Sequence, residues 1–357
     1  MKKRQPHKNI PKDQFEEEQG QGGFYGPVSH LIRKQPSTRW THIEGNLKPR
    51  LFDLPKMQGK ECWEKLLYND FLNIYLYRCE KPPQTAFRSG DGDILFFCHE
   101  GEGVLLTEYG LLNYFAGQYI LIPKCFTHVF IPKKPSGFFV VESLQSHFRE
   151  PDRGLLGRHG LYSSSSLMRP DLKALHNYLK EQNLEFKKVA VFRQNEVTHF
   201  TYSDCIFDVT EWQGDLFPYA LDMKDIMPVM SHRVHLPPSV HTTFMTNDFI
   251  ICSFLPRPLE QDEDALKIPF YHQNTDYDEV LFYHKGDFFS RDNLRAGMMS
   301  LHPAGFPHGP HPKAIQAIKG KTHTNEWAVM LDSKHPLKWT ENLSSLEVKS
   351  YWKSWQS

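Results

Sequence analysis

One frame of glycine, proline and histidine occurs twice in the sequence, and this repeat limits the possible folds more than any other feature. Residues 117–128 read Gly-x5-Pro-x-Cys-x2-His, and residues 297–308 read Gly-x5-Pro-x-Gly-x2-His. The second copy lies 180 residues after the first, about half of the 357-residue chain. A unit that recurs at a fixed offset indicates copies of one domain, and such glycines and prolines form turns between short strands. The repeat therefore predicts two β-barrels in one chain.

The rest of the sequence also favours a mainly β protein. Aromatic residues make up 13% of the chain, and 25 prolines and 22 glycines supply many turns. Several short segments are rich in β-branched or aromatic residues and are bounded by glycine or proline, as strands are. These segments are residues 72–77, 93–97, 103–108 and 119–122. Residues 170–180 instead have apolar side chains at helical spacing, with Ser166 as a possible cap.

These patterns divide the chain into five parts. The two frames mark the barrels, the helical segment joins them, and the two ends lie outside. We expect a mobile N-terminal arm at 1–22, a degenerate barrel at 23–145, a connecting segment with the helix at 146–190, a catalytic barrel at 191–345 and a C-terminal tail at 346–357. The tail either docks on a neighbouring subunit or is a simple extension.

The stretch from residue 272 to residue 308 contains the best candidate for a metal site. It offers two imidazoles and one carboxylate, those of His272, Glu279 and His308, with turn residues between them. Two histidines and one carboxylate on one face hold ferrous iron and leave positions open for substrate and dioxygen. Because Asn274 occupies the position of a second nearby histidine, the sequence predicts a three-ligand Fe(II) site.

Four neighbouring residues are alternative ligands. His302 lies in the strand segment before Pro303, and a role in orienting a ligand suits it better than ligation. His311 lies between two prolines, which predicts a loop-exposed residue or one at the mouth of a pocket. His284 is expected on the opposite face of the strand, and Asp278 is an alternative carboxylate beside Glu279.

The first frame has one histidine but no comparable ligand set. The equivalent stretch upstream, residues 88–93, contains arginine, serine, glycine and aspartate but no histidine. We therefore expect no metal in the first barrel and a structural role for His128 at a strand end.

Charge and cysteine content limit the partners and the location. Lysine and arginine number 42, as do aspartate and glutamate, so no excess charge attracts nucleic acid or an anionic membrane. No apolar run approaches the roughly 20 residues that span a bilayer. The six cysteines are scattered without a Cys-x-x-Cys pair. This pattern indicates reduced thiols and a cytoplasmic protein.

Several segments resemble the homogentisate 1,2-dioxygenase family, whose members are iron-dependent proteins with cupin barrels. The resemblance is carried by residues 207–215 with 218–219, by 271–274, and by 300–302 with 307–310. It implies two jelly-roll barrels of cupin type, and a reaction that opens the ring of homogentisate with both atoms of O2. The implied product is maleylacetoacetate, in tyrosine and phenylalanine catabolism. The resemblance also implies a homo-oligomer, either a trimer or a hexamer.

The resemblance also suggests roles for individual residues. His272, Glu279 and His308 match the iron ligands of the family, and His235 matches a histidine of acid–base chemistry on the substrate hydroxyl. An uncharged imidazole near the metal could accept that phenolic proton. The residues that the resemblance places against the substrate are Phe288, His302, Asn274 and His308.

Three departures from the family leave the substrate open. Gln273 stands where the family has arginine, Phe288 stands where it presents a substrate-binding tyrosine, and one extra residue separates His272 from Glu279. One alternative is a dioxygenase for gentisate or another hydroquinone acid. The other is a non-catalytic protein with two cupin barrels that binds a small ligand.

Overall fold

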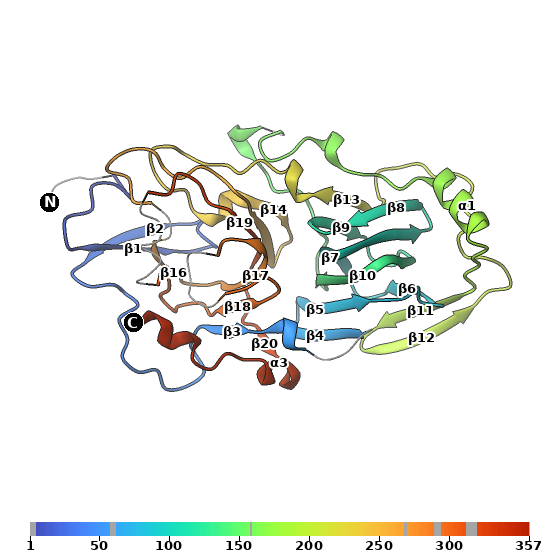
Figure 1. Ribbon diagram of the computed structural model, residues 1–357, viewed down its shortest axis with the longest axis horizontal. Coiled ribbons are helices and arrows are strands. Elements are labelled where there is room, and N and C mark those ends of the chain that lie inside the picture. The colour runs from blue at the N-terminus through green and yellow to red at the C-terminus, as the bar shows by residue number, and fades with distance from the viewer. Residues whose placement is uncertain are drawn as a thin grey trace. The chain divides into compact units, whose positions relative to one another are not determined.

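The protein is mainly β and forms two compact units. The computed structural model describes residues 5–57, 62–157, 159–267, 270–288, 294–311 and 320–356. Unit 1 comprises Met1–Met57, Glu150–Asp152 and Pro228–Ser357, and unit 2 comprises Gln58–Arg149 and Arg153–Met227. Each unit is built on curled β-sheets (Figure 1). The prediction of a mainly β chain with two barrels is therefore confirmed.

Unit 2 is organised around two long antiparallel strands, β7 (Asp93–Thr107) and β10 (His128–Ser143). The other strands are β4 (Cys62–Tyr68), β5 (Leu72–Cys79), β6 (Ala86–Ser89), β8 (Gly110–Phe115), β9 (Gln118–Ile122), β11 (Lys188–Arg193), β12 (Glu196–Thr201) and β13 (Tyr219–Asp222). Aromatic side chains such as Phe96, Phe130 and Phe138 fill the interior and are almost fully buried. This interior is a packed hydrophobic core.

The helix of unit 2 is α1 (Leu172–Glu181), close to its predicted position. Asp171 caps it by accepting a hydrogen bond from the Ala174 N–H at 3.0 Å. The expected cap Ser166 lies instead in a 3-10 turn, η3 (Ser164–Ser166), where a short serine run forms its own local hydrogen bonds. Three more 3-10 turns of the chain are η2 (Gly154–Leu156), η4 (Met223–Asp225) and η5 (Pro238–His241).

Unit 1 contains a six-stranded sheet and a three-stranded sheet. The larger has the order β14 (Thr242–Met245), β15 (Phe249–Phe254), β19 (Glu326–Ser333), β17 (Asp278–Gly286), β18 (Met299–His302) and β3 (Arg50–Phe52). The smaller has the order β16 (Tyr271–Asn274), β1 (Phe15–Gly20) and β2 (Val28–Arg33), three strands that lie side by side in Figure 1. The remaining elements are η1 (Leu54–Lys56), β20 (Lys338–Trp339), α3 (Glu341–Ser345) and η6 (Tyr351–Trp355).

Both ends of the chain belong to unit 1, which differs from the expected arm and tail. In place of a mobile arm at 1–22, β1 pairs in parallel with β16 and buries three consecutive glutamates, Glu16–Glu18. In place of a free tail at 346–357, Tyr351 and Trp355 pack into the hydrophobic core of unit 1. β1 also pairs with the nearby β2, but its pairing with β16 and the packing of Tyr351 and Trp355 join segments far apart in the sequence. Long-range contacts of this kind leave no local pattern.

The central boundaries differ as well. β11 pairs in parallel with β6, and β13 pairs antiparallel with β9, so residues 191–227 complete unit 2. The sequence analysis had assigned them to the second barrel. Most of the expected connection at 146–190, including α1, also lies within unit 2.

Candidate metal centre

Backbone pairing brings His272 and His308 together. His272 lies on β16, and His308 follows the turn after β18. The two residues form an isolated antiparallel bridge, in which each N–H donates to the carbonyl of the other at 2.8 Å. Their imidazole centroids are 4.1 Å apart. Glu279, the second residue of β17, pairs across the sheet with His302 of β18.

Each of the three predicted ligands presents one atom to a common point. Glu279 Oε2 lies 3.7 Å from His272 Nε2 and 3.5 Å from His308 Nε2. All three ligand atoms lie within 4.8 Å of one another. The Nδ1 atoms face backbone carbonyls instead, at 3.2 Å from Phe270 O for His272 and 3.0 Å from Phe306 O for His308. An Nδ1–H that donates to a carbonyl leaves Nε2 as the acceptor that binds a metal.

His302 orients the carboxylate from its other side. Its Nδ1 lies 2.7 Å from Glu279 Oε1, and its Nε2 lies 3.2 Å from the Tyr351 hydroxyl. Burial would raise the pKa of Glu279, but the surrounding imidazoles, His308 foremost, hold that pKa well below its usual value. Glu279 therefore remains an anion in a buried position, which a cation site requires.

His235 is buried near this centre but has partners of its own. Its Nδ1 lies 3.0 Å from Glu260 Oε1, and its ring centroid lies 4.5 Å from that of Phe270. The Phe270 ring in turn lies 5.4 Å from the His272 ring. Burial lowers the pKa of His235 to about 4, so its imidazole is neutral at physiological pH. With Nδ1–H donating to Glu260, Nε2 is the atom that can accept a proton.

Two of the residues predicted to contact the substrate, Asn274 and Phe288, interact with other residues of the protein. Asn274 Oδ1 accepts a hydrogen bond from the Tyr277 N–H at 3.2 Å and so caps the turn between β16 and β17. Phe288 is 9% exposed and packs against Tyr283 at 5.1 Å in the hydrophobic core. These contacts give both side chains a role in packing or turn formation.

Unlike His302, the other three alternative ligands have contacts outside the cluster of His272, Glu279 and His308. His311 was expected in an exposed loop or at a pocket mouth, but it is fully buried because Trp355 packs against it at 4.3 Å between centroids. Asp278 accepts hydrogen bonds from the Ala304 and Leu337 N–H groups, both at 2.8 Å, so its two oxygens bind backbone. His284 is buried further along β17.

In unit 2, the equivalent frame ends in an aromatic core. His128 is 2% exposed, and its ring lies 5.2 Å from Phe87 and 5.7 Å from Phe96. Among the described residues, both clusters with metal-ligand geometry lie in unit 1. One is the predicted set, and the other, His7 with Glu18 and His30, was missed by the sequence analysis.

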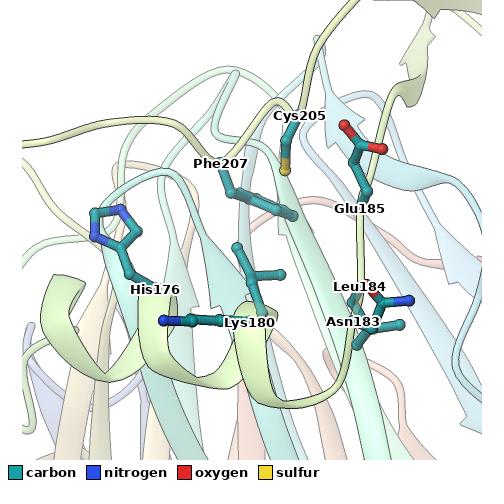
Figure 2. A pocket seen from close by; sticks show the side chains of 8 residues that line it. His176, Lys180, Asn183, Leu184, Glu185, Cys205 and Phe207 are labelled. Atoms are coloured by element: carbon teal, nitrogen blue, oxygen red, sulfur yellow. The ribbon is translucent and has the colours of Figure 1, made fainter.

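Unit 2 also has an open hollow of about 520 Å³ beside α1 (Figure 2). His176 and Lys180 of the helix line one side, and Cys205 and Phe207 lie across from them. Its lining is mixed in charge and polarity, and we assign it no catalytic role.

Two family models match the chain. The model described as the N-terminal domain of homogentisate 1,2-dioxygenase matches residues 52–223, and the model of the C-terminal domain matches residues 224–357. The chain belongs to the homogentisate 1,2-dioxygenase family. The boundary between the two matches coincides closely with the change from unit 2 to unit 1 at Met227 and Pro228.

Curated relatives agree with this membership of the homogentisate 1,2-dioxygenase family. A Saccharolobus solfataricus protein, named only provisionally as a dioxygenase, is 30% identical and is matched over 95% of this chain and 92% of its own length. Homogentisate 1,2-dioxygenases of Oryza sativa and Dictyostelium discoideum are 29% and 28% identical, over 71% and 80% of this chain. The matches span 55% and 68% of those two enzymes.

Two solved structures show a weak similarity to the chain. A cupin 2 conserved barrel domain protein from Leptotrichia buccalis shares 11% identity at a TM-score of 0.37, covering 78% of this chain and 92% of that one. A Bacillus subtilis oxalate decarboxylase variant shares 10% identity at a TM-score of 0.38, covering 85% of this chain and 81% of the other.

Within the described residues, no helix has the length and apolar character needed to cross a bilayer.

Proposed function

We propose that this protein is an Fe(II)-dependent dioxygenase that opens the aromatic ring of homogentisate to give maleylacetoacetate. The observation that carries the proposal is the convergence of His272, Glu279 and His308 within 4.8 Å, in a chain of this family. Both atoms of O2 enter the product in such a reaction, so no external reductant is needed. We further propose that the protein is cytoplasmic, as its cysteine pattern indicates, and that it is a homo-oligomer, as the family resemblance implies.

The donor set fits a ferrous ion. The separations of 3.5 and 3.7 Å between Glu279 Oε2 and the two imidazole Nε2 atoms are shorter than two metal–ligand bonds of about 2.1 Å laid end to end. His272 and His308 offer neutral nitrogens, and Glu279 offers one negative charge. When bound, ferrous iron supplies coordination positions for the substrate oxygens and for dioxygen.

The protein's own contribution is orientation and proton transfer. His302 holds Glu279 Oε1, which leaves Oε2 directed at the two imidazoles. His235, neutral and held by Glu260, is proposed to accept the proton of the substrate's phenolic hydroxyl on Nε2. Buried aromatic side chains such as Phe270 line this region and keep water from it.

The test is oxygen consumption by the iron-loaded protein with a panel of hydroquinone acids. We expect turnover with homogentisate, with maleylacetoacetate as the product identified by mass spectrometry. Turnover with gentisate in place of homogentisate would contradict the assigned substrate but keep the reaction class. Absence of turnover with every acid, in protein shown to contain iron, would favour a binding protein over an enzyme.

A further inference from the structure

A second group of imidazoles and carboxylates lies on the three-stranded sheet of unit 1. Glu18 on β1 is directly opposite His30 on β2 and is paired with His272 on β16. Side chains of directly paired residues project from the same face of a sheet. Glu16 shares this face because it lies two residues before Glu18. His7, in the segment before β1, completes the group.

The ligand atoms of this group are arranged much as those of the candidate iron centre are. His7 Nε2 lies 3.5 Å from Glu18 Oε2, and His30 Nε2 lies 3.9 Å from Glu18 Oε1. Each of the three side chains offers a ligand atom within 4.8 Å of the others. Glu18 is 3% exposed, and its Oε2 has no hydrogen-bond partner within the described part of the chain. A buried carboxylate oxygen without a hydrogen bond needs an explanation, and a bound ion between Glu18, His7 and His30 provides one.

The Glu16 carboxylate lies on the Nδ1 side of both imidazoles, those of His7 and His30. Its carboxylate oxygens lie 3.5 Å from His7 Nδ1 and 3.2 Å from His30 Nδ1, and they accept the His7 backbone N–H at 2.9 Å. Neither Nδ1 forms a hydrogen bond within the described part of the chain, but the carboxylate lies at ion-pair distance on the Nδ1 side of both rings, which leaves Nε2 to face a metal. His7 also has a φ of 58°, a left-handed conformation that few residues other than glycine adopt and that clusters at functional sites.

We propose that His7, Glu18 and His30 bind a second divalent transition-metal ion, with Zn²⁺ as the ion that best suits two imidazoles and one carboxylate. This ion would join the N-terminal segment to β1 and β2. Because β1 pairs with β16, it would also hold the strand that carries His272. The inference concerns residues outside the proposed iron centre and does not require the proposed reaction.

A buried ion pair is the rival explanation. Burial lowers the pKa of His7, but Glu16 and Glu18 outweigh it and raise that pKa to about 9. A protonated His7 could thus balance the two carboxylates without any metal. Other groups near this cluster are His272, which is paired with Glu18, His235, 5.9 Å from His7 between ring centroids, and the Phe270 ring at 4.7 Å from His7.

Zinc binding by the full-length, metal-free protein separates the two explanations. We would titrate it with Zn²⁺ and measure the bound ion by elemental analysis after desalting. The proposal predicts two ions in the wild type, one in His30→Asn, one in His308→Ala, and at least tenfold weaker binding of one ion in Glu18→Gln. Glu18→Gln preserves side-chain volume, so it tests the site even if His30→Asn folds poorly.

The matched control is His42→Asn, which removes an exposed histidine of the same unit and should still bind two ions. The proposal is overturned if His30→Asn and Glu18→Gln bind as many ions as the wild type with the same affinity. If instead the proposed iron centre binds no ion, the result is different, because His308→Ala would then bind as many ions as the wild type.

Discussion

At the scale of single residues, the candidate iron centre depends on the side chain behind its carboxylate. His302 donates to Glu279 Oε1 and is itself held by the Tyr351 hydroxyl. Residue spacing was sufficient to predict that the side chains of His272, Glu279 and His308 lie together, because the turns between them are local features. The contact between His302 and Glu279 depends on strand register, which the sequence does not specify.

The substitution His302→Phe tests this dependence. It keeps a ring between His308 and Tyr351 but removes the donor that lies 2.7 Å from Glu279 Oε1. We expect the affinity for Fe(II) to fall roughly 10–100-fold, measured by competition with a chelator. Tyr283→Phe is the control, because it removes one buried hydroxyl contact, to Ser300, away from the carboxylate. Equal iron affinity in His302→Phe and the wild type would refute the orienting role.

His128 should make the fold sensitive to acid. Burial lowers its pKa to about 4, whereas the unfolded chain binds the proton near pH 6.5. Protonation of His128 therefore lowers the stability of the folded state as the pH falls from 6.5 towards 4, by about 2 kcal/mol at pH 5, and His128 contributes no change in stability above pH 6.5. We expect His128→Phe to lose less stability than the wild type between pH 7 and pH 5, as measured by urea unfolding at both pH values. The control is His176→Ala, which removes an exposed histidine and should lose as much stability as the wild type. An equally large loss in His128→Phe would exclude His128 as the source of the acid sensitivity.

At the scale of elements, the bridge between β16 and the segment at His308 sets the spacing of the two imidazoles. Gly309 allows the close approach, because an added Cβ there would lie 2.8 Å from Phe270 O and from Tyr271 Cα. Both atoms belong to the backbone, so the strands would have to separate.

We therefore expect Gly309→Ala to weaken metal binding and to lower the free energy of unfolding by on the order of 2–4 kcal/mol. Gly305→Ala is its control, since its Cβ would meet no atom within 4 Å although its φ is +73°. That change should cost about 1 kcal/mol of conformational strain and leave metal affinity intact. Similar metal affinities in the two variants would contradict the importance of the bridge.

Local sequence patterns predicted the positions of individual strands and helices better than they predicted which strands pair with one another. The expected strands at 72–77 and 119–122 lie within β5 and β9. Those expected at 93–97 and 103–108 form one continuous strand, β7, which ends at Thr107. The helix α1 begins two residues after its predicted start. The glutamates of β1 show no apolar alternation, because Glu16 and Glu18 contact imidazoles rather than a hydrophobic core. Glu16, Glu17 and Glu18 are consecutive, so the sequence offers no alternation that could have revealed this strand.

At the scale of the whole molecule, the two copies of the repeated Gly-Pro-His frame end in different surroundings. The copy in unit 2 ends among aromatic rings at His128, and the copy in unit 1 ends at His308 opposite another imidazole. Unit 1 is assembled from both ends of the chain. Sequence alone could predict two barrels, but not that residues before position 57 complete the second one.

Deletion of residues 1–22 distinguishes a mobile arm from an integral strand. A mobile arm could be removed without consequence, whereas the structure predicts a lower melting temperature and loss of metal, because β1 is the shared neighbour of β2 and β16. Thermal unfolding and metal content of the shortened chain provide the measurement. An unchanged melting temperature would mean that β1 adds nothing to the stability of unit 1.

Iron content and homogentisate turnover, measured on the same preparations of the wild type and His308→Ala, test the central claim most directly. The control is His323→Ala, which removes an exposed histidine of unit 1. The account predicts one iron at this centre and ring opening in the wild type and in His323→Ala, with both lost together in His308→Ala. Full activity in His308→Ala would contradict it.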